Sequence, residues 1–551
     1  MRTPNPMRTP DARAVPGSTC FSLWAERSST YCAIAALCCG LGLTLVRAAD
    51  WATDGGDTQR TGWQKDEHIL SKDNVKNLKL LWKLKTDNIT RALFSYTPAL
   101  ILQNVPSGGA TKEMVYVVGA SDNLYAIDPA TGTIAWQKHF TYEAPPGRGG
   151  GGGGNNANQD PAHLGFLGPG GSTDTPVIGP PGPNGHRPLY MTDGGGMLHT
   201  LDTANGEDLT PPFRFGQSKF PLQLVGNTLW APVGRGMAAT KLDDPTHHVY
   251  LTQGMGNSGG LWGLRGAAVD STGTVWSTTG DGNVDESDPN NLIIANSMVG
   301  FVIDGDHVKV KDYFTPPNWY WLWKRDLDPN NTATIFTYKG RELMVASGKE
   351  CRVFLLDPRS PGGADHHTPL YKTPLFCNED ADFQDQGSWG ALSTWEDASG
   401  TRWILAPFWG PAHSQFKFPI VNTPVAKEGG VAAFKLQETA GKLELVPVWV
   451  SRDMFRGYPP VIANGVVYTF GSGDFTKQAT PERGLNFDSS LRAAESTHAT
   501  IYALDGQTGK ELWSSGNTIT SFNHFNGLSL ANGKLYLGTY DGTFWAFGLP
   551  K

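Results

Sequence analysis

The sequence predicts an all-β fold, a β-propeller of about eight four-stranded blades. The strongest of three observations is an internal repeat, because residues 124–136 recur in similar form as residues 501–513. In each copy a strand leads into a turn that carries Asp and Gly, and a second strand ends in Trp. Asp hydrogen-bonds the backbone of such a turn, and Gly supplies its positive φ. One hairpin of this kind cannot bury both of its faces, so it must stack against further copies.

Weaker copies of the repeat are the second observation, and composition is the third. The weaker units are residues 115–128, 189–202, 229–243, 275–304, 343–357, 403–436, 466–505 and 535–547. They give about eight blades, within the roughly 4 to 8 that propellers use, and seven stays an alternative. The 67 Gly, 38 Pro and only 18% charged residues suit many short strands joined by turns. Helical periodicity is nearly absent, and one short helix is expected at residues 71–80.

The first 49 residues have a different character from the rest. They contain several Arg, no acidic excess and an apolar run at residues 31–46. This pattern predicts a secretory signal peptide over residues 1–49, with cleavage after Ala48. The apolar run, at about 16 residues, is short for a transmembrane helix. We therefore expect a periplasmic or secreted protein with no membrane span in the mature chain.

Residues 50–551 are predicted to form one propeller with two insertions. The first insertion, residues 145–171, is rich in Gly, and the second, residues 471–496, is polar. The formal net charge of −7 is small and is not grouped into blocks, so no nucleic-acid partner is expected. Cys351 and Cys377 are the only cysteines outside the signal segment. An oxidising compartment would allow them to pair, but the sequence leaves this open.

Three segments resemble a known family. The repeat resembles the pyrroloquinoline quinone (PQQ) repeat, and residues 50–57 with residues 74–82 resemble the opening of quinoprotein alcohol dehydrogenases. Residues 532–542 are similar to the last blade of the soluble polyvinyl-alcohol dehydrogenase branch. The resemblance implies an eight-bladed propeller that binds PQQ and a calcium ion near its axis.

The resemblance also implies a cofactor floor and a metal site. Trp262 matches the Trp that stacks under the planar quinone. Asn283 is the first candidate for a calcium ligand from the following Gly-rich turn, and Asp281 is the second. The alternative is a turn between two strands that holds no metal. Asp193 stands in a shorter loop where the family has a calcium-binding Glu, and a closer backbone would let it bind the ion.

The same family resemblance also implies which residues are catalytic. Asp326 matches the first Asp of the family's Trp-Asp-x-Asp segment, which implies a general base that is also a metal ligand. Lys349 matches the basic residue that contacts the quinone oxygens. Arg325 departs from the pattern, since the family has Trp there. A lanthanide in place of calcium stays open, because Asp328 adds a carboxylate near Asp326.

Two functions follow from these residues. The first is a secreted quinoprotein oxidoreductase that oxidises an alcohol, polyol or sugar with PQQ and calcium. Its electrons would pass to a separate acceptor such as a cytochrome. The alternative is a cofactor-free propeller of PQQ-like repeats that serves as a protein-binding scaffold in the cell envelope. The two differ in whether Trp262, Asn283, Asp326 and Lys349 converge at one end of the axial channel.

Overall fold

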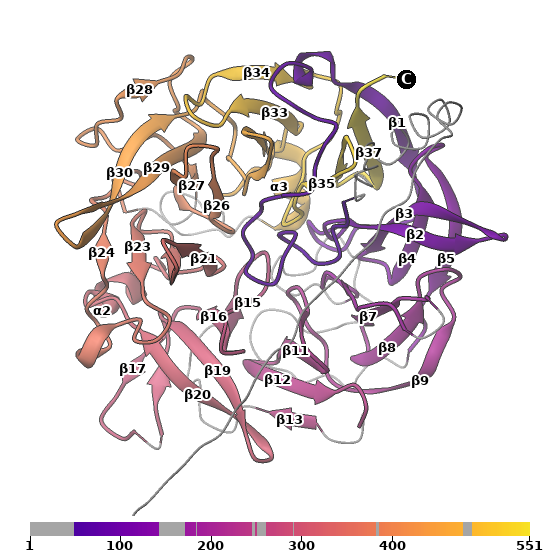
Figure 1. Ribbon diagram of the computed structural model, residues 1–551, viewed down its shortest axis with the longest axis horizontal. Coiled ribbons are helices and arrows are strands. Elements are labelled where there is room, and N and C mark those ends of the chain that lie inside the picture. The colour runs from indigo at the N-terminus through magenta and orange to yellow at the C-terminus, as the bar shows by residue number, and fades with distance from the viewer. Residues whose placement is uncertain are drawn as a thin grey trace, which may run out of the picture. The chain divides into compact units, whose positions relative to one another are not determined.

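The chain forms a ring of β-sheets. The computed structural model describes residues 49–142, 171–182, 185–244, 248–250, 260–289, 291–381, 385–477 and 488–550. These residues build eight sheets set around an axis like the blades of a propeller (Figure 1). The predicted fold is confirmed, with eight blades rather than seven. Residues 1–48 of the predicted signal peptide lie outside the described residues, as do residues 145–170 and 478–487 of the two insertions.

Blades 1 to 4 take their strands in chain order, with the first strand nearest the axis (Figure 1). Blade 1 comprises β2 (Leu100–Ser107), β3 (Ala110–Gly119), β4 (Asn123–Asp128) and β5 (Thr133–His139). Blade 2 comprises β6 (Val177–Ile178), β7 (Pro188–Thr192), β8 (Met197–Asp202) and β9 (Asp208–Arg214). Blade 3 comprises β10 (Gln223–Val225), β11 (Thr228–Val233), β12 (Gly236–Lys241) and β13 (His248–Tyr250). Blade 4 comprises β14 (Leu261–Trp262), β15 (Ala268–Val269), β16 (Val275–Thr279), β19 (Met298–Asp304) and β20 (His307–Phe314), and it carries the small hairpin β17 (Val284–Asp285) and β18 (Ile293–Ile294).

Blades 5 to 8 complete the ring. Blade 5 comprises β21 (Thr334–Tyr338), β22 (Arg341–Ser347), β23 (Val353–Leu356) and β24 (Tyr371–Lys372). Blade 6 comprises β25 (Gly387–Ser388), β26 (Ser393–Glu396), β27 (Arg402–Trp409), β29 (Gly429–Thr439), β30 (Lys442–Val450) and β28 (Ile420–Val421). Blade 7 comprises β31 (Val461–Ala463), β32 (Val466–Gly471), β33 (Thr500–Asp505) and β34 (Glu511–Ser514). Blade 8 comprises β35 (Ser529–Ala531), β36 (Lys534–Gly538) and β37 (Thr543–Gly548), with β1 (Lys79–Lys85) as its outer strand.

Strand β1 closes the ring by joining the two ends of the chain. It pairs antiparallel with β37, from Lys79 opposite Gly548 to Lys85 opposite Thr543. The helix expected at residues 71–80 is wrong, because this part of the chain has only one 3₁₀ turn, Val75–Asn77, before β1 begins. Pairing with the last blade satisfies the backbone of β1 and overrides its local helical pattern.

The repeat hairpins have a clear packing role. In β4 and β5, Gly132 has φ 72° and Asp128 accepts a hydrogen bond from the Ala130 N–H at 2.8 Å. A Cβ atom on Gly132 would collide with the ring of Trp82 from the neighbouring blade. Likewise, the indole of Trp136 donates to the turn of the next blade, at 3.2 Å from the carbonyl oxygen of Thr203. Each Trp therefore packs on the Gly of the adjoining blade.

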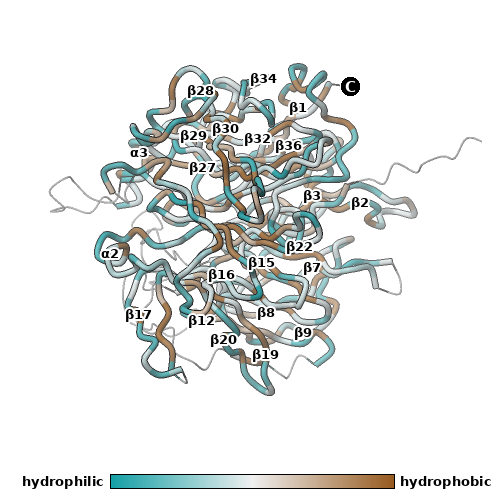
Figure 2. The backbone as a smooth tube through the Cα atoms, turned by 60° about the vertical axis from the view of Figure 1, so that its left-hand side comes forward, coloured by the Kyte–Doolittle hydropathy of each residue, from teal (hydrophilic) through white to brown (hydrophobic). Residues whose placement is uncertain are grey.

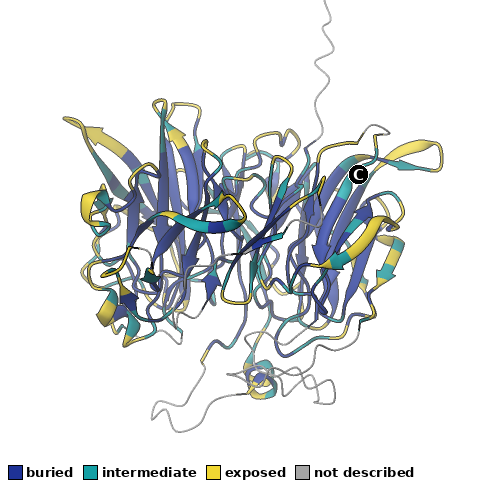
Figure 3. Cartoon of the chain, turned by 90° about the horizontal axis from the view of Figure 1, so that it is seen from below, coloured by how far each residue is buried: buried dark blue, intermediate teal, exposed yellow. Residues whose placement is uncertain are grey.

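The amino-terminal segment runs through the centre of the ring before it reaches β1 (Figure 1). Its backbone bonds the innermost strands of six blades. The bonded pairs are Trp51 with Ile101, Ala52 with Ile178, Thr58 with Val269, Gln59 with Ile335, Thr61 with Thr394 and Gln64 with Ile462, at 2.8 to 3.0 Å. Hydrophobic stretches follow the strands (Figure 2), and the strands are buried while many loops are exposed (Figure 3).

The helices are short. Helix α2 (Trp319–Trp323) lies in the connection between blades 4 and 5, and α3 (Ser489–Glu495) lies between two strands of blade 7. No helix in the described part of the chain is long and apolar enough to cross a bilayer.

Candidate active site

Four charged side chains meet at one end of blades 4 and 5. The Nζ atom of Lys349 lies 2.8 Å from Oδ1 of Asp326 and 2.7 Å from Oδ1 of Asp328. The carboxyl group of Asp281 belongs to the same cluster, because one oxygen from each of the three Asp lies within 4.8 Å of the others. We call these four residues the acidic site.

Loops at the same end of two adjacent blades deliver these side chains. Asp281 follows β16, the strand second from the axis in its blade, and Lys349 follows the equivalent strand β22. Asp326 and Asp328 lie in the connection from α2 to β21. In a propeller the loops that leave equivalent strands lie at the same end of the ring. Residues far apart in the sequence therefore reach one point.

The turn after α2 gives its two Asp different environments. Asp326 has φ 55°, and the N–H of the buried Leu327 donates back to the carbonyl oxygen of Leu322 at 3.0 Å. The side chain of Asp326 is 39% exposed, whereas that of Asp328 is 3% exposed. A ligand from solvent can therefore approach Asp326, while Asp328 is buried and binds Lys349.

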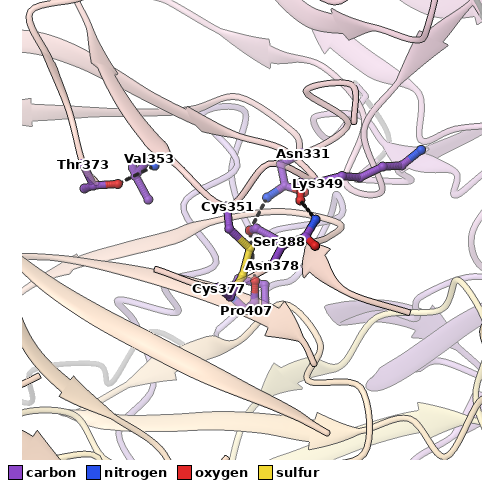
Figure 4. The surroundings of a disulfide bond; sticks show 9 residues. All are labelled: Asn331, Lys349, Cys351, Val353, Thr373, Cys377, Asn378, Ser388 and Pro407. Carbon is purple, nitrogen blue, oxygen red and sulfur yellow. Dashed lines mark hydrogen bonds between the residues drawn. A yellow bond between two sulfur atoms is a disulfide. The ribbon is translucent and has the colours of Figure 1, made fainter. Parts of the chain in front are cut away.

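The backbone of Lys349 is clamped on several sides (Figure 4). Cys351, two residues along, forms a disulfide with Cys377, and their Cα atoms are 5.3 Å apart. Beside Cys377, the side-chain amide of Asn378 donates to the carbonyl oxygen of Lys349 at 2.6 Å. Gly387 packs so closely on Lys349 that a Cβ atom there would lie 2.8 Å from the same oxygen. The pairing that the sequence left open thus occurs beside the acidic site.

Burial and mutual repulsion control the protonation of the acidic site. Burial, together with the charges of Asp328 and Asp326, raises the pKa of Asp281 to about 8. Burial also raises the pKa of Asp328 to about 6, against the lowering effect of Lys349. Burial lowers the pKa of Lys349, but the two neighbouring carboxylates outweigh this and raise it overall. One ammonium group does not balance three carboxylates.

The acidic site has the donor set of a hard cation site. Calcium and similar ions bind several carboxylate oxygens. One oxygen of Asp281, Oδ1, is buried and has no hydrogen-bond partner among the described residues. A cation would satisfy this oxygen and would allow Asp281 and Asp328 to stay ionised near neutral pH.

Aromatic side chains adjoin the acidic site. Trp389 lies edge-to-face with Trp262, with ring centres 6.2 Å apart, and Nζ of Lys349 is 5.7 Å from the ring centre of Trp389. Phe525 stacks on Trp389 at 5.4 Å. The rings offer flat apolar faces to a planar ligand. The cavity between them has room for about one water molecule, so a fused-ring quinone requires Trp389 or Phe525 to move.

The remaining predicted ligands lie differently. Asn283 follows Asp281 in the same turn, where its backbone carbonyl accepts from the N–H of Ala295 at 3.3 Å. Asp193 is not part of the acidic site. Its carboxylate accepts from the N–H of Met197 at 2.9 Å and contacts Nε2 of His199 at 3.3 Å. The structure thus brings together Trp262, Asp281, Asp326 and Lys349, and it leaves Asp193 in blade 2.

Trp389 and Asn378 were not predicted from the sequence. A second internal repeat could have identified Trp389, because Trp262 and Trp389 are each followed by Gly. In both cases an Asp comes eight residues after the Trp and a Gly three residues later, in Asp270–Gly273 and Asp397–Gly400. Asn378 has no such signal, since its role depends on a disulfide that brings two loops together.

Comparisons with known proteins agree with this architecture. No protein-family model matches the chain, and no curated protein matches it. A europium-containing methanol dehydrogenase superposes with a TM-score of 0.56 at 12% identity, covering 91% of this chain and 98% of that one. Quinohemoprotein alcohol dehydrogenases from Comamonas testosteroni and Pseudomonas putida HK5 superpose with TM-scores of 0.51 and 0.53 at 13% and 11% identity, each covering 91% of this chain and 80% of the other. The chain therefore has the eight-bladed propeller fold of the quinoprotein alcohol dehydrogenases.

Proposed function

We propose that this protein is a quinoprotein oxidoreductase that oxidises an alcohol, polyol or sugar with PQQ and a hard cation, calcium or a lanthanide. One observation carries the proposal: the side chains of Asp281, Asp326 and Lys349 converge beside Trp262 and Trp389. The electrons would pass to a separate acceptor such as a cytochrome. A periplasmic or secreted location is part of the same proposal.

Each residue has a role that its surroundings support. Asp281 and Asp328 would hold the cation together with Asp326, because their oxygens already lie close together. Trp262 would lie against a quinone face, and Lys349 would donate to a quinone oxygen. PQQ, when bound, supplies the acceptor for the hydride that leaves the alcohol carbon.

The proton of the alcohol goes to the protein. Asp326 is the carboxylate that solvent and substrate can reach, since its side chain is far more exposed than that of Asp328. It would accept the hydroxyl proton as a general base. The Lys349 ammonium binds both Asp326 and Asp328, which fixes the base and its buried neighbour in one arrangement. Asn378 and the Cys351–Cys377 disulfide hold the backbone that carries this ammonium group.

The small cavity favours the alternative, a cofactor-free scaffold of the envelope. Among the described residues, the space between the aromatic rings holds about one water molecule and not a fused-ring ligand. In that function the acidic site would serve only to join blades 4 and 5. The two functions differ sharply in whether the protein binds PQQ.

A binding titration tests the proposal. Purified protein is titrated with PQQ in the presence of calcium or lanthanum, and tryptophan fluorescence is recorded. We expect saturable, metal-dependent quenching that weakens in the Asp281→Asn variant. The exposed Asp285→Asn serves as a matched control and is expected to behave as wild type. A folded wild-type protein with no metal-dependent quenching would establish the scaffold alternative instead.

A further inference from the structure

The cavity beside the acidic site has one amide side chain among its described lining residues. Its lining includes Phe220, Trp262, Leu264, Trp389 and Phe525, all apolar or aromatic, together with Asn330. No charged side chain of the described residues lines it. The cavity therefore suits an uncharged part of a ligand. Trp262 and Trp389 bring indole N–H donors, and among the described lining residues only Asn330 has a side chain that can both donate and accept.

The amide of Asn330 is buried and unsatisfied. The residue is 3% exposed, and neither Oδ1 nor Nδ2 has a hydrogen-bond partner among the described residues. Its neighbours are each bound through at least one polar atom, since Nδ2 of Asn331 donates to Ser388 at 2.8 Å and Asp328 forms an ion pair with Lys349, although Oδ1 of Asn331 also has no hydrogen-bond partner among the described residues. Because a buried donor or acceptor without a partner is costly, most such groups in folded proteins are paired.

The backbone on both sides of Asn330 is held in place. The N–H of Lys349 donates to the carbonyl oxygen of Asp328 at 3.2 Å, and a Cβ atom on Gly348 would collide with Asp328 and Pro329. On the other side, the N–H of Thr332 donates to the carbonyl oxygen of Gly390 at 3.0 Å. The loop is thus held at both ends, with Asn330 among the residues that line the cavity.

We propose that Asn330 is the hydrogen-bonding residue of this cavity and binds an uncharged oxygen, a carbonyl or a hydroxyl, of the ligand that enters between Trp262 and Trp389. An amide offers one donor group and one acceptor atom without a charge. This proposal rests on the function given above, in which two molecules could supply the oxygen. One is a ring carbonyl of the quinone, and the other is the hydroxyl of the alcohol.

The first test concerns stability and needs no cofactor. Asn330→Leu keeps the approximate size of the side chain and removes the unsatisfied amide. We expect it to raise Tm by about 1 to 3 °C in the protein without added ligand. The matched control is Asn422→Leu, because the Asn422 amide donates to the carbonyl oxygens of Val450 and Thr508 at 2.9 and 3.0 Å. That variant should lower Tm. A fall in Tm for Asn330→Leu would mean that an internal water satisfies the amide, which overturns the proposal.

The second test distinguishes the sources of the oxygen. In Asn330→Leu, a PQQ affinity reduced by about 3- to 10-fold with unchanged KM for the alcohol assigns the amide to the quinone. A KM raised by a similar factor with unchanged PQQ affinity assigns it to the substrate. No change in either, in a protein that binds PQQ, contradicts the proposal. If the wild type binds no PQQ, the proposed function fails, and the stability test alone decides the role of Asn330.

Discussion

Two groups of carboxylates occupy the same end of the propeller and differ in how they are satisfied. The acidic site lies at blades 4 and 5, and a second cluster, the Asp122 group, lies at blades 1 and 2 and consists of Asp122, Asp174 and Asp193. Members of both groups follow the second strand of a blade: Asp281 follows β16, Asp122 follows β3 and Asp193 follows β7. Sequence position alone therefore does not tell a ligand site from a structural one.

Hydrogen-bond donors tell the groups apart. Asp122 accepts from four donors, namely the Arg91 guanidinium at 3.1 Å, the Tyr142 hydroxyl at 3.0 Å, the Ser172 hydroxyl at 2.9 Å and the Gly194 N–H at 3.2 Å. Asp174, which is buried, accepts from Thr192 through Oδ2, while its Oδ1 has no hydrogen-bond partner among the described residues. Burial raises its pKa to about 7, so protonation removes about half of its charge at pH 7 without a cation. In the acidic site one ammonium group faces three carboxyl groups. The acceptor oxygens therefore outnumber the donors, and a cation can bind there.

The largest expected effect concerns the proton acceptor. Asp326→Asn keeps the shape of the side chain but cannot accept a proton from the alcohol. We expect turnover with an artificial electron acceptor to fall by about 10²- to 10⁴-fold. The measurement is steady-state kinetics on protein saturated with PQQ and metal. Turnover within threefold of wild type, at full cofactor occupancy, would remove Asp326 from the mechanism.

A substitution in the Asp122 group should lower the stability of the fold rather than turnover or metal binding. Asp122→Ala leaves Arg91, Tyr142 and Ser172 without their buried acceptor. The free energy of unfolding should fall by about 2 to 4 kcal/mol. Urea unfolding measures this loss, and metal affinity measured under folding conditions should stay at the wild-type value. A loss of metal affinity without a loss of stability would reverse the assignment of the two groups.

The fold could be predicted because the Asp, the Gly and the Trp of the repeat each make a contact that is set by their position in the repeat. Asp128 caps its turn, Gly132 gives way to a Trp of the neighbouring blade, and Trp136 donates to the next turn. The contacts of the Asp and the Gly recur in other copies, where Asp202 and Asp505 cap their turns and Gly206 and Gly509 pack on Trp136 and Trp449, so the pattern is visible in the sequence. The strand β1 was not predictable in this way, because its pairing partner lies at the far end of the chain.

The site could be predicted only in part. Asp326, Lys349 and Trp262 stand in recognisable motifs, and the structure places them together. The choice between Asn283 and Asp281 could not be made from the sequence, since it depends on how the turn after β16 faces blade 5. Trp389 and the clamp on Lys349 come from the next blade and from a disulfide. The disulfide and the Asn378 contact that hold Lys349 do not recur from blade to blade, so they leave no spacing signal in the repeat.

A smaller effect is expected for metal binding at Asp281. Asp281→Asn removes one carboxylate oxygen and should weaken calcium or lanthanum binding by about 10- to 100-fold, as measured by calorimetry. The pH dependence sharpens the test. The pKa of Asp281 in the folded protein is raised from 3.8 to about 8, so the metal-free fold loses stability as pH rises from about 4 to 8.

A cation must displace the proton of Asp281 below pH 8. The affinity of the wild-type protein for the metal ion should therefore rise with pH, by up to about tenfold per pH unit for this one proton, and should level off above pH 8. The Asp281→Asn variant should lack that part of the rise. The same slope in both proteins would show that Asp281 does not exchange its proton for the metal.

The smallest expected effect is at Asp193, the residue of the Asp122 group that the family resemblance places in the metal site. Asp193→Asn retains an oxygen that can accept from the Met197 N–H, and it changes only the contact with His199. We expect metal affinity and turnover within about twofold of wild type, because its carboxylate already has protein partners and lies outside the acidic site. A tenfold loss of metal affinity would require the loop of Asp193 to move toward Asp281 when the ion binds. The cation site would then draw on both carboxylate groups, and the difference between them would describe only the metal-free protein.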